Sequence, residues 1–496
     1  MSKSKADVSR LMERVHRSLQ REAQMSHKKW FRFRRTVSDD GDIEETALTP
    51  ANHNPWYCLA TLHGEQPVDH FDHQLHEKNR VDWERWITGA ANDPEQRNEL
   101  AANFGRRASS SKSLTLPEPG TPVDFSHTRF DGRVHLAGFR FPVPADFHSA
   151  TFSADASFTA AQFNRIADFS SATFSGDTKF DRAHFDVGGD FQSATFAKRA
   201  DFEYVSNFVN ANFRSATFSD YADFNNVSFN GDRPDFFLAR FSSDVDFASA
   251  KFNGGVDFGS ATFSKTASFN AATFNMANFN AATFFNPVTF INAKFNGSAS
   301  FAFARFDAQP PDFRGATMHE ATEWHGVTWP KPPKTKANAQ QQVYVYERLK
   351  QEMERLKKHE DEQKFFRREL RARRRLLWAS PGDWLLNFLY ERSSDYGLSV
   401  IRPLFWLFFV FAAGTAFFAG YPLYCGAPMP ITLAAELSGA NILVFLPNKR
   451  EIMMDTKVVD CLSNTATVAI STAQSLLGVV LLFLLGLALR NRFRMR

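Results

Sequence analysis

Phenylalanine returns every five or six residues along the middle of the chain, from Phe125 to Phe313. Alanine stands two residues before most of these rings and a polar residue lies between them, as in Ala145-Asp146-Phe147. Side chains alternate sides in an extended segment, so this pattern turns alanine and phenylalanine inward and the polar residue outward. The residues that follow are small or polar and suit turns. The pattern predicts short straight segments and corners that wind into a stacked solenoid.

This repeat resembles that of pentapeptide-repeat proteins, whose motif is alanine, Asp or Asn, Leu or Phe, and two turn residues. The resemblance covers residues 123–330 and implies a mainly β fold, a right-handed quadrilateral parallel β-helix with four pentapeptides per coil. This chain adds one residue to most second units. We therefore expect about 22 residues per coil, with bulges at two opposite corners, and roughly nine to ten coils. The expected core includes Phe147, Phe152, Phe158, Phe163, Phe169, Phe174, Phe180, Phe185, Phe191 and Phe196.

Segments on both sides of the repeat are predicted to be helical. The ends of a stacked column expose apolar surface and strand edges, so each end needs a cap. Residues 51–104 contain three tryptophans and form the expected N-terminal cap, which a Ser- and Pro-rich linker (105–122) joins to the repeat. Residues 339–378 are predicted to be a basic amphipathic helix or a helical hairpin.

Residues 1–50 are polar and charged, with a basic stretch before an acidic one, and predict a mobile N-terminal segment that contains a short amphipathic helix. The segment would be either a solvated tail or an electrostatic contact with anionic lipid or nucleic acid.

Two long apolar segments, 398–423 and 469–489, follow the helical region. Each is long enough to cross a bilayer core of about 30 Å, whereas the alternative is a pair of buried helices in a soluble protein. Arginines precede the first segment and fill the tail 490–496, while the loop 424–468 has few basic residues. Because basic residues favour the cytoplasmic side, we expect both termini and the repeat to be cytoplasmic. The predicted location is the bacterial inner membrane, with two passes.

The loop 424–468 contains two of the three cysteines, Cys425 and Cys461. An extracytoplasmic loop in a bacterium is exposed to an oxidising environment, which predicts a disulfide between them. The alternative is a pair of unpaired thiols.

The layout of the C-terminal region is similar to that of membrane-bound bacterial pentapeptide-repeat proteins, some of which carry a two-span module like that of potassium channels. The loop has no Thr-Val-Gly-Tyr-Gly sequence or close variant, so it lacks the run of carbonyls that replaces an ion's hydration shell. The resemblance therefore extends to a filterless module. A transport-related protein with the repeat as its cytosolic regulatory domain stays an alternative.

Charge argues against a nucleic-acid role. The net charge is +4 and the repeat is only mildly acidic, with Arg and Lys interspersed. Pentapeptide-repeat proteins that mimic DNA and bind topoisomerases need a strongly acidic surface. DNA mimicry is therefore the second alternative, and nucleic acid is not expected as a partner.

The sequence has no recognisable catalytic motif, so we expect no enzyme, no cofactor and no small-molecule substrate.

His70, His73 and His76 are spaced for one side of a helix, near His63, and could provide zinc ligands. The favoured alternative is an ordinary polar helix, because no cysteine pair or His-Glu-x-x-His motif accompanies them.

The sequence predicts a membrane-anchored scaffold that binds membrane lipid and an unidentified protein, and it leaves the oligomeric state open.

Overall fold

The computed structural model describes residues 48–67, 69–89, 93–108, 114–420, 429–443 and 465–494. All of them belong to one compact unit, Leu48–Arg496. The predicted N-terminal segment lies outside the described residues except for its last three positions, and so do Cys425 and Cys461.

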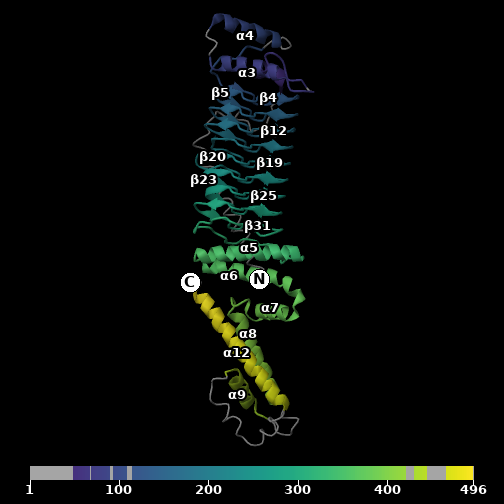
Figure 1. The fold of residues 1–496 in the computed structure, drawn as a ribbon, viewed down its shortest axis with the longest axis vertical. Helices are drawn as coiled ribbons and strands as arrows, with labels where there is room; N and C mark the ends of the chain where they lie inside the picture. The colour runs from purple at the N-terminus through teal and green to yellow at the C-terminus, as the bar shows by residue number, and fades with distance from the viewer. Residues whose placement is uncertain are drawn as a thin grey trace, which may run out of the picture. The chain divides into compact units, whose positions relative to one another are not determined.

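Residues 123–329, here called the repeat column, form a parallel β-solenoid (Figure 1). The chain passes through four ladders of short parallel strands in each turn. The ladder here called the threonine face consists of β1 (Thr49–Pro50), β3 (Thr128–Phe130), β7 (Thr151–Phe152), β11 (Thr173–Phe174), β15 (Thr195–Phe196), β18 (Thr217–Phe218), β21 (Arg240–Phe241), β24 (Thr262–Phe263), β27 (Thr283–Phe284) and β31 (Arg305–Phe306).

The other three ladders also consist mostly of short strands, although two of their strands have seven and six residues. The aspartate face begins with β2 (Val123–Asp124), β6 (Ala145–Asp146), β10 (Ala167–Asp168) and β14 (Gly189–Asp190), and ends at β30 (Ala299–Ser300). The third face consists of β4 (Val134–His135), β8 (Ala156–Ser157), β12 (Thr178–Lys179), β16 (Ala200–Asp201), β19 (Ala222–Asp223), β22 (Val245–Asp246), β25 (Ala267–Ser268) and β28 (Val288–Thr289). The fourth face contains β5 (Arg140–Phe141), β9 (Gln162–Phe163), β13 (His184–Phe185), β17 (Phe208–Val209), β20 (Ser228–Asn230), β23 (Lys251–Asp257), β26 (Thr273–Asn278) and β29 (Lys294–Phe295).

The strand register fixes the length of a turn. Thr151 pairs with Thr173, and Thr173 with Thr195, so equivalent positions lie 22 residues apart over much of the column. Within the repeat column the threonine face has nine strands, from β3 to β31. The chain therefore makes about eight turns between the first and the last of them. The sequence predicted nine to ten coils, which is slightly high. Isolated bridges replace strands after β31, where Pro310 and Pro311 cannot donate a backbone hydrogen bond.

The corners alternate between two geometries. At the five-residue steps a residue with positive φ turns the chain, such as Ser149 (φ 55°) and Ala160 (φ 54°). At these two corners Ala150 N–H donates to Phe147 O and Ala161 N–H to Phe158 O, each at 3.0 Å. Although the six-residue step from Phe202 to Phe208 has two such residues, Tyr204 and Asn207, the six-residue step through 153–155 has no positive φ. The extra residue therefore widens two opposite corners and removes the need for a left-handed conformation there.

Phenylalanine rings fill the column. All ten rings expected in the core are fully buried. Rings one turn apart stack, as for Phe152 and Phe174, with centroids 4.7 Å apart and planes at 6°. Rings on neighbouring faces meet edge to face, as for Phe158 and Phe169 at 5.3 Å and 81°. Each buried ring contributes roughly 1.5–3 kcal/mol, and each aromatic pair adds about 0.5–1.5 kcal/mol.

Helices cover the N-terminal end of the column: η1 (Ala51–His53), α2 (Pro55–Ala60), α3 (His73–Ile87) and α4 (Pro94–Arg107). Side chains of Asn54, Asp72 and Asp93 cap the starts of α2, α3 and α4. Trp83 of α3 is fully buried, lies against Phe139 and Phe141, and donates its indole N–H to Arg140 O at 2.8 Å. Trp83 thus covers the apolar end of the first turn and provides a hydrogen-bond donor for the carbonyl of Arg140.

Two helices cover the other end, α5 (Lys336–Arg355) and α6 (His359–Arg373). Of the two arrangements that the sequence allows, the structure has the hairpin, with a left-handed residue at Lys357. Phe365 of α6 packs edge to face on Trp324 and Trp329, and Tyr346 of α5 meets Trp329. One hydrophobic core therefore runs from the N-terminal helices through the column into this hairpin.

The remaining elements are η2 (Leu376–Ala379), α7 (Pro381–Ser394), α8 (Ile401–Gly420), α9 (Ile431–Ile442) and α12 (Thr465–Arg494). Two helical segments, Ile401–Gly420 and Thr467–Phe493, are long and apolar enough to cross a membrane. They overlap the predicted spans 398–423 and 469–489. Between them α9 is a helix within the segment that the sequence assigned to a loop.

Candidate functional site

The outer surface of the column carries straight rows of side chains. On the aspartate face, Asp124, Asp146, Asp168 and Asp190 lie on successive paired strands. Each carboxylate accepts a hydrogen bond from the backbone N–H two residues later, for example His148 N–H to Asp146 Oδ1 at 2.8 Å. The Asp of the repeat therefore stabilises the corner as well as facing the solvent.

Stacked carboxylates repel one another. The pKa of Asp146 is raised, first by burial, and also by Asp168 and Asp124 on the adjacent turns. Asparagine then takes the place of aspartate one turn beyond Asp190: the Asn212 amide donates to Asp190 Oδ1 at 2.9 Å. An amide at this point converts a repulsive contact into a hydrogen bond and interrupts the row of carboxylates, which resumes at Asp235.

One group of three acidic side chains could hold a metal ion within the described ranges. The ligand atoms of Asp201, Glu203 and Asp223 lie within 4.8 Å of one another. Arg199 already forms ion pairs with Asp201 (3.4 Å) and Asp223 (3.2 Å), so a guanidinium supplies the positive charge there. Burial raises the pKa of both Asp223 and Glu203, and neighbouring carboxylates raise it further.

The histidines considered as zinc ligands have separate polar partners, although His73 and His76 both pack on Phe71. His63 Nε2 lies 2.8 Å from Asp82 Oδ2, and His76 Nε2 lies 2.9 Å from Ala137 O. Burial lowers the pKa of His76. The His73 ring packs on Phe71, while His70 is exposed. The structure does not bring these side chains together as a ligand set.

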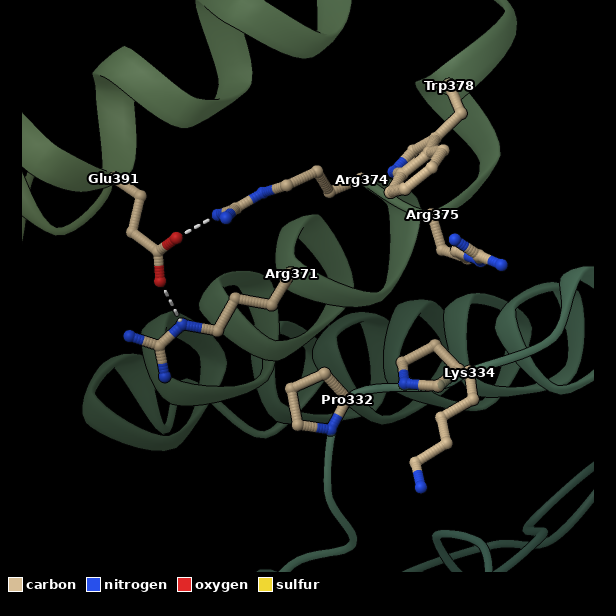
Figure 2. A pocket seen from close by; sticks show the side chains of 8 residues that line it. Pro332, Lys334, Arg371, Arg374, Arg375, Trp378 and Glu391 are labelled. Atoms are coloured by element: carbon tan, nitrogen blue, oxygen red, sulfur yellow. Dashed lines mark hydrogen bonds and ion pairs between the residues drawn. The ribbon is translucent and has the colours of Figure 1, made fainter.

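A cavity of about 640 Å³, here called the neck pocket, opens where the hairpin meets η2 and α7 (Figure 2). Four basic side chains line it, Lys334, Arg371, Arg374 and Arg375, with one acidic residue, Glu391, and Trp378 at its border. The Glu391 carboxylate accepts from Arg371 Nε at 2.7 Å and from Arg374 (Figure 2). The Arg375 guanidinium lies over the Trp378 ring, 4.5 Å from its centroid.

Beside the neck pocket, a second carboxylate fastens α6 to the start of α8. Asp395, the residue directly after α7, pairs with Arg367 at 2.8 Å and Arg371 at 3.0 Å. Asp395, Tyr396 and Gly397 all have positive φ. Three left-handed residues in succession make a tight bend, which the ion pairs to Asp395 hold in place.

Polar side chains join the three apolar helices. Gln474 of α12 donates to Ser438 Oγ of α9 at 2.6 Å and to Val410 O of α8 at 3.2 Å. Asn441 of α9 donates to Gln474 Oε1 at 3.1 Å. Gly414 permits this approach, because a Cβ there would lie 2.2 Å from the Gln474 amide nitrogen. In apolar surroundings such groups need partners, and here they supply them to one another.

The geometry of the column agrees with its comparison to known families. Residues 158–206 match the sequence model of the family described as pentapeptide repeats (9 copies). No curated protein and no solved structure matches the chain. The matched residues run through successive turns whose stacked rings and outward polar positions have been described above.

Sequence reasoning missed the neck pocket and the polar contacts of α9. Arg371 and Glu391 lie 20 residues apart on different helices, and no periodic pattern links them. The basic run 367–375 was a visible signal of positive charge, but it did not show which arginines face a cavity. For α9, the apolar segment ITLAAELSGANI was the available signal.

Proposed function

We propose that the chain is a membrane-anchored scaffold that presents its pentapeptide-repeat column to a protein partner at the cytoplasmic face of a bacterial inner membrane. The observation that supports it is the set of straight rows on the column. Four successive threonines of the threonine face, from Thr151 to Thr217, lie in register one turn apart. Rows of equal polar groups at a spacing of about 4.8 Å suit docking of an extended protein surface.

The distribution of arginines supports the proposed orientation of the chain in the membrane. Arg367, Arg371 and Arg374 precede the first apolar helix, and Arg490 and Arg492 end the second. Because basic residues favour the cytoplasmic side, this distribution favours a column and two termini on that side. The segment between the helices would then be extracytoplasmic, and a Cys425–Cys461 disulfide stays a prediction there. Mass mapping of the loop with and without reductant tests the bridge.

Transport is the second candidate, and the packing of α9 favours it. A short helix held between two long apolar ones by Ser438, Asn441 and Gln474 is an arrangement that could line a path through an oligomer. Current across planar bilayers that contain the purified protein, abolished by deletion of 398–494, would support transport.

Anchoring and docking need separate tests. In the first, the full chain should stay in the membrane pellet after alkaline extraction, and a chain that ends at residue 397 should be released. The column should resist protease added to intact spheroplasts and be cut after lysis. Release of the full chain by alkali would refute anchoring, and cleavage in intact spheroplasts would refute the orientation.

In the second test, a proximity-labelling enzyme is fused to the N-terminus of the full chain. The control lacks residues 123–330 but keeps the apolar helices. We expect the full chain to label a protein that the control does not label. Equal labelling by both chains would contradict a docking role for the column.

A further inference from the structure

The neck pocket carries positive charge that the described residues neutralise only in part. Glu391 is its one acidic residue and is already shared by Arg371 and Arg374. Within the part of the chain that the structure describes, Arg375 and Lys334 have no carboxylate partner. A cavity of about 640 Å³ is large enough for a phosphate with a small polar headgroup. Its chemistry therefore favours an anion.

The helix that borders the pocket has an apolar surface that the described part of the chain leaves exposed. Ser394 is the only buried residue of α7. Leu386 is 67% exposed, and Leu385 and Leu389 are about half exposed. Trp378, just before the helix, is 64% exposed. An apolar helix beside basic side chains is typical of a segment that lies in the interfacial layer of a membrane.

The position of α7 fits that layer. Arg402 Nη1 donates to Glu391 O at 2.8 Å, and the Trp406 indole donates to Arg392 O at 3.4 Å. These contacts hold the C-terminal end of α7 against the first turns of α8. Arginine and tryptophan are also the residue types that anchor a span at its interface. The adjoining α8 also exposes apolar side chains, and Phe408 is 68% exposed.

We propose that the neck pocket binds the phosphate of an anionic phospholipid headgroup, while α7 and Trp378 lie in the interfacial layer of the same leaflet. This rests on the proposed membrane anchoring. Arg375 and Lys334 supply the charge that attracts the phosphate, and Trp378 contacts the glycerol and upper acyl region. The Arg371–Glu391–Arg374 cluster forms the wall of the pocket, because its charges already satisfy one another in part.

The test is native mass spectrometry of the full-length protein in detergent, titrated with phosphatidylglycerol or with phosphatidylcholine. Lys334→Ala with Arg375→Ala removes the unpaired charges, and Arg165→Ala with Lys265→Ala is a matched control on exposed positions of the column. Each basic residue near a lipid surface contributes about 1 kcal/mol. We expect phosphatidylglycerol binding to weaken roughly 10- to 30-fold in the first variant and to be unchanged in the control.

Four results would overturn the proposal: equal phosphatidylglycerol binding by both variants, equal affinity for the two lipids, displacement of the lipid by inorganic phosphate at comparable concentration, and no quenching of Trp378 by brominated acyl chains. Quenching is measured as the difference between wild type and Trp378→Phe. Circular dichroism checks that the variants keep their fold. Alkaline extraction is measured in parallel, so loss of lipid binding in a variant that stays in the membrane is distinguished from failure of anchoring.

Discussion

The aspartate face offers a test of electrostatics in the column. Asp146 stands in the middle of a run of carboxylates, between Asp124 and Asp168. At a strand spacing of about 4.8 Å, two unit charges repel by roughly 0.9 kcal/mol even in water. Two such neighbours, screened by solvent, predict that Asp146→Asn stabilises this part of the column by about 1 kcal/mol at neutral pH. The amide keeps the acceptor for His148 N–H.

The pH dependence of this gain has a defined sign. The pKa of Asp146 is raised in the folded protein, whereas an unfolded aspartate titrates near about 3.9. The folded state therefore binds the proton more tightly, and wild type loses stability as pH rises through the folded pKa. The advantage of Asp146→Asn should be absent below the unfolded pKa and complete at neutral pH. Added salt should reduce it.

Hydrogen exchange of peptides that span β6 and β10 is the suitable assay, because solenoids open locally. A gain of 1 kcal/mol slows exchange about fivefold in these peptides. Asp232→Asn is the matched control, since Asp232 is exposed and lies outside the carboxylate rows. Its exchange should not change. If Asp146→Asn exchanges as fast as wild type at neutral pH, repulsion along the row does not limit stability.

Three further changes test other contacts. Phe180→Ala removes a ring whose centroid lies 4.7 and 5.0 Å from those of the rings stacked on it, and should lower the free energy of unfolding by roughly 3–5 kcal/mol. The measurement is the midpoint of thermal unfolding, followed by the circular-dichroism signal of the β structure. An unchanged midpoint would contradict a packed core. Ala160→Gly relieves a left-handed Cβ and should slow local exchange by the equivalent of about 1 kcal/mol, whereas faster exchange would show that chain entropy dominates. Gly414→Ala forces Cβ against Gln474 and should destabilise the apolar helices by about 1–3 kcal/mol in detergent melts, with column exchange unchanged.

The column could be predicted from sequence because its pattern is local and repeated. A ring such as Phe169 has the same neighbours along the chain as Phe147 and Phe191, so one register satisfies every turn. The left-handed corners were not predicted. Ser149 and Ala160 belong to residue types that rarely adopt positive φ, and the turns above and below impose it. Here tertiary packing overrides local preference.

The neck pocket could not be predicted because it depends on how helices cross. Arg371 belongs to a predicted helix, but its partner Glu391 lies beyond the bend at η2. The sequence shows a basic segment and an apolar one in succession. Which side chains meet, and which remain unpaired, follows from the three-dimensional path between α6 and α8.

Different interactions stabilise the column with its caps and the region that joins it to the apolar helices. From the N-terminal helices to Phe365, buried rings and aliphatic side chains form one continuous core. Beyond it, arginines of α6 pair with Glu391 of α7 and with Asp395, and Asp395 also lies 3.8 Å from Arg402 of α8. Apolar packing has no charges that salt can screen, whereas a partly exposed ion-pair network weakens in salt and can exchange partners with an anion. An anionic headgroup in the neck pocket would therefore act on the joint between the column and the apolar helices, and leave the column itself unchanged.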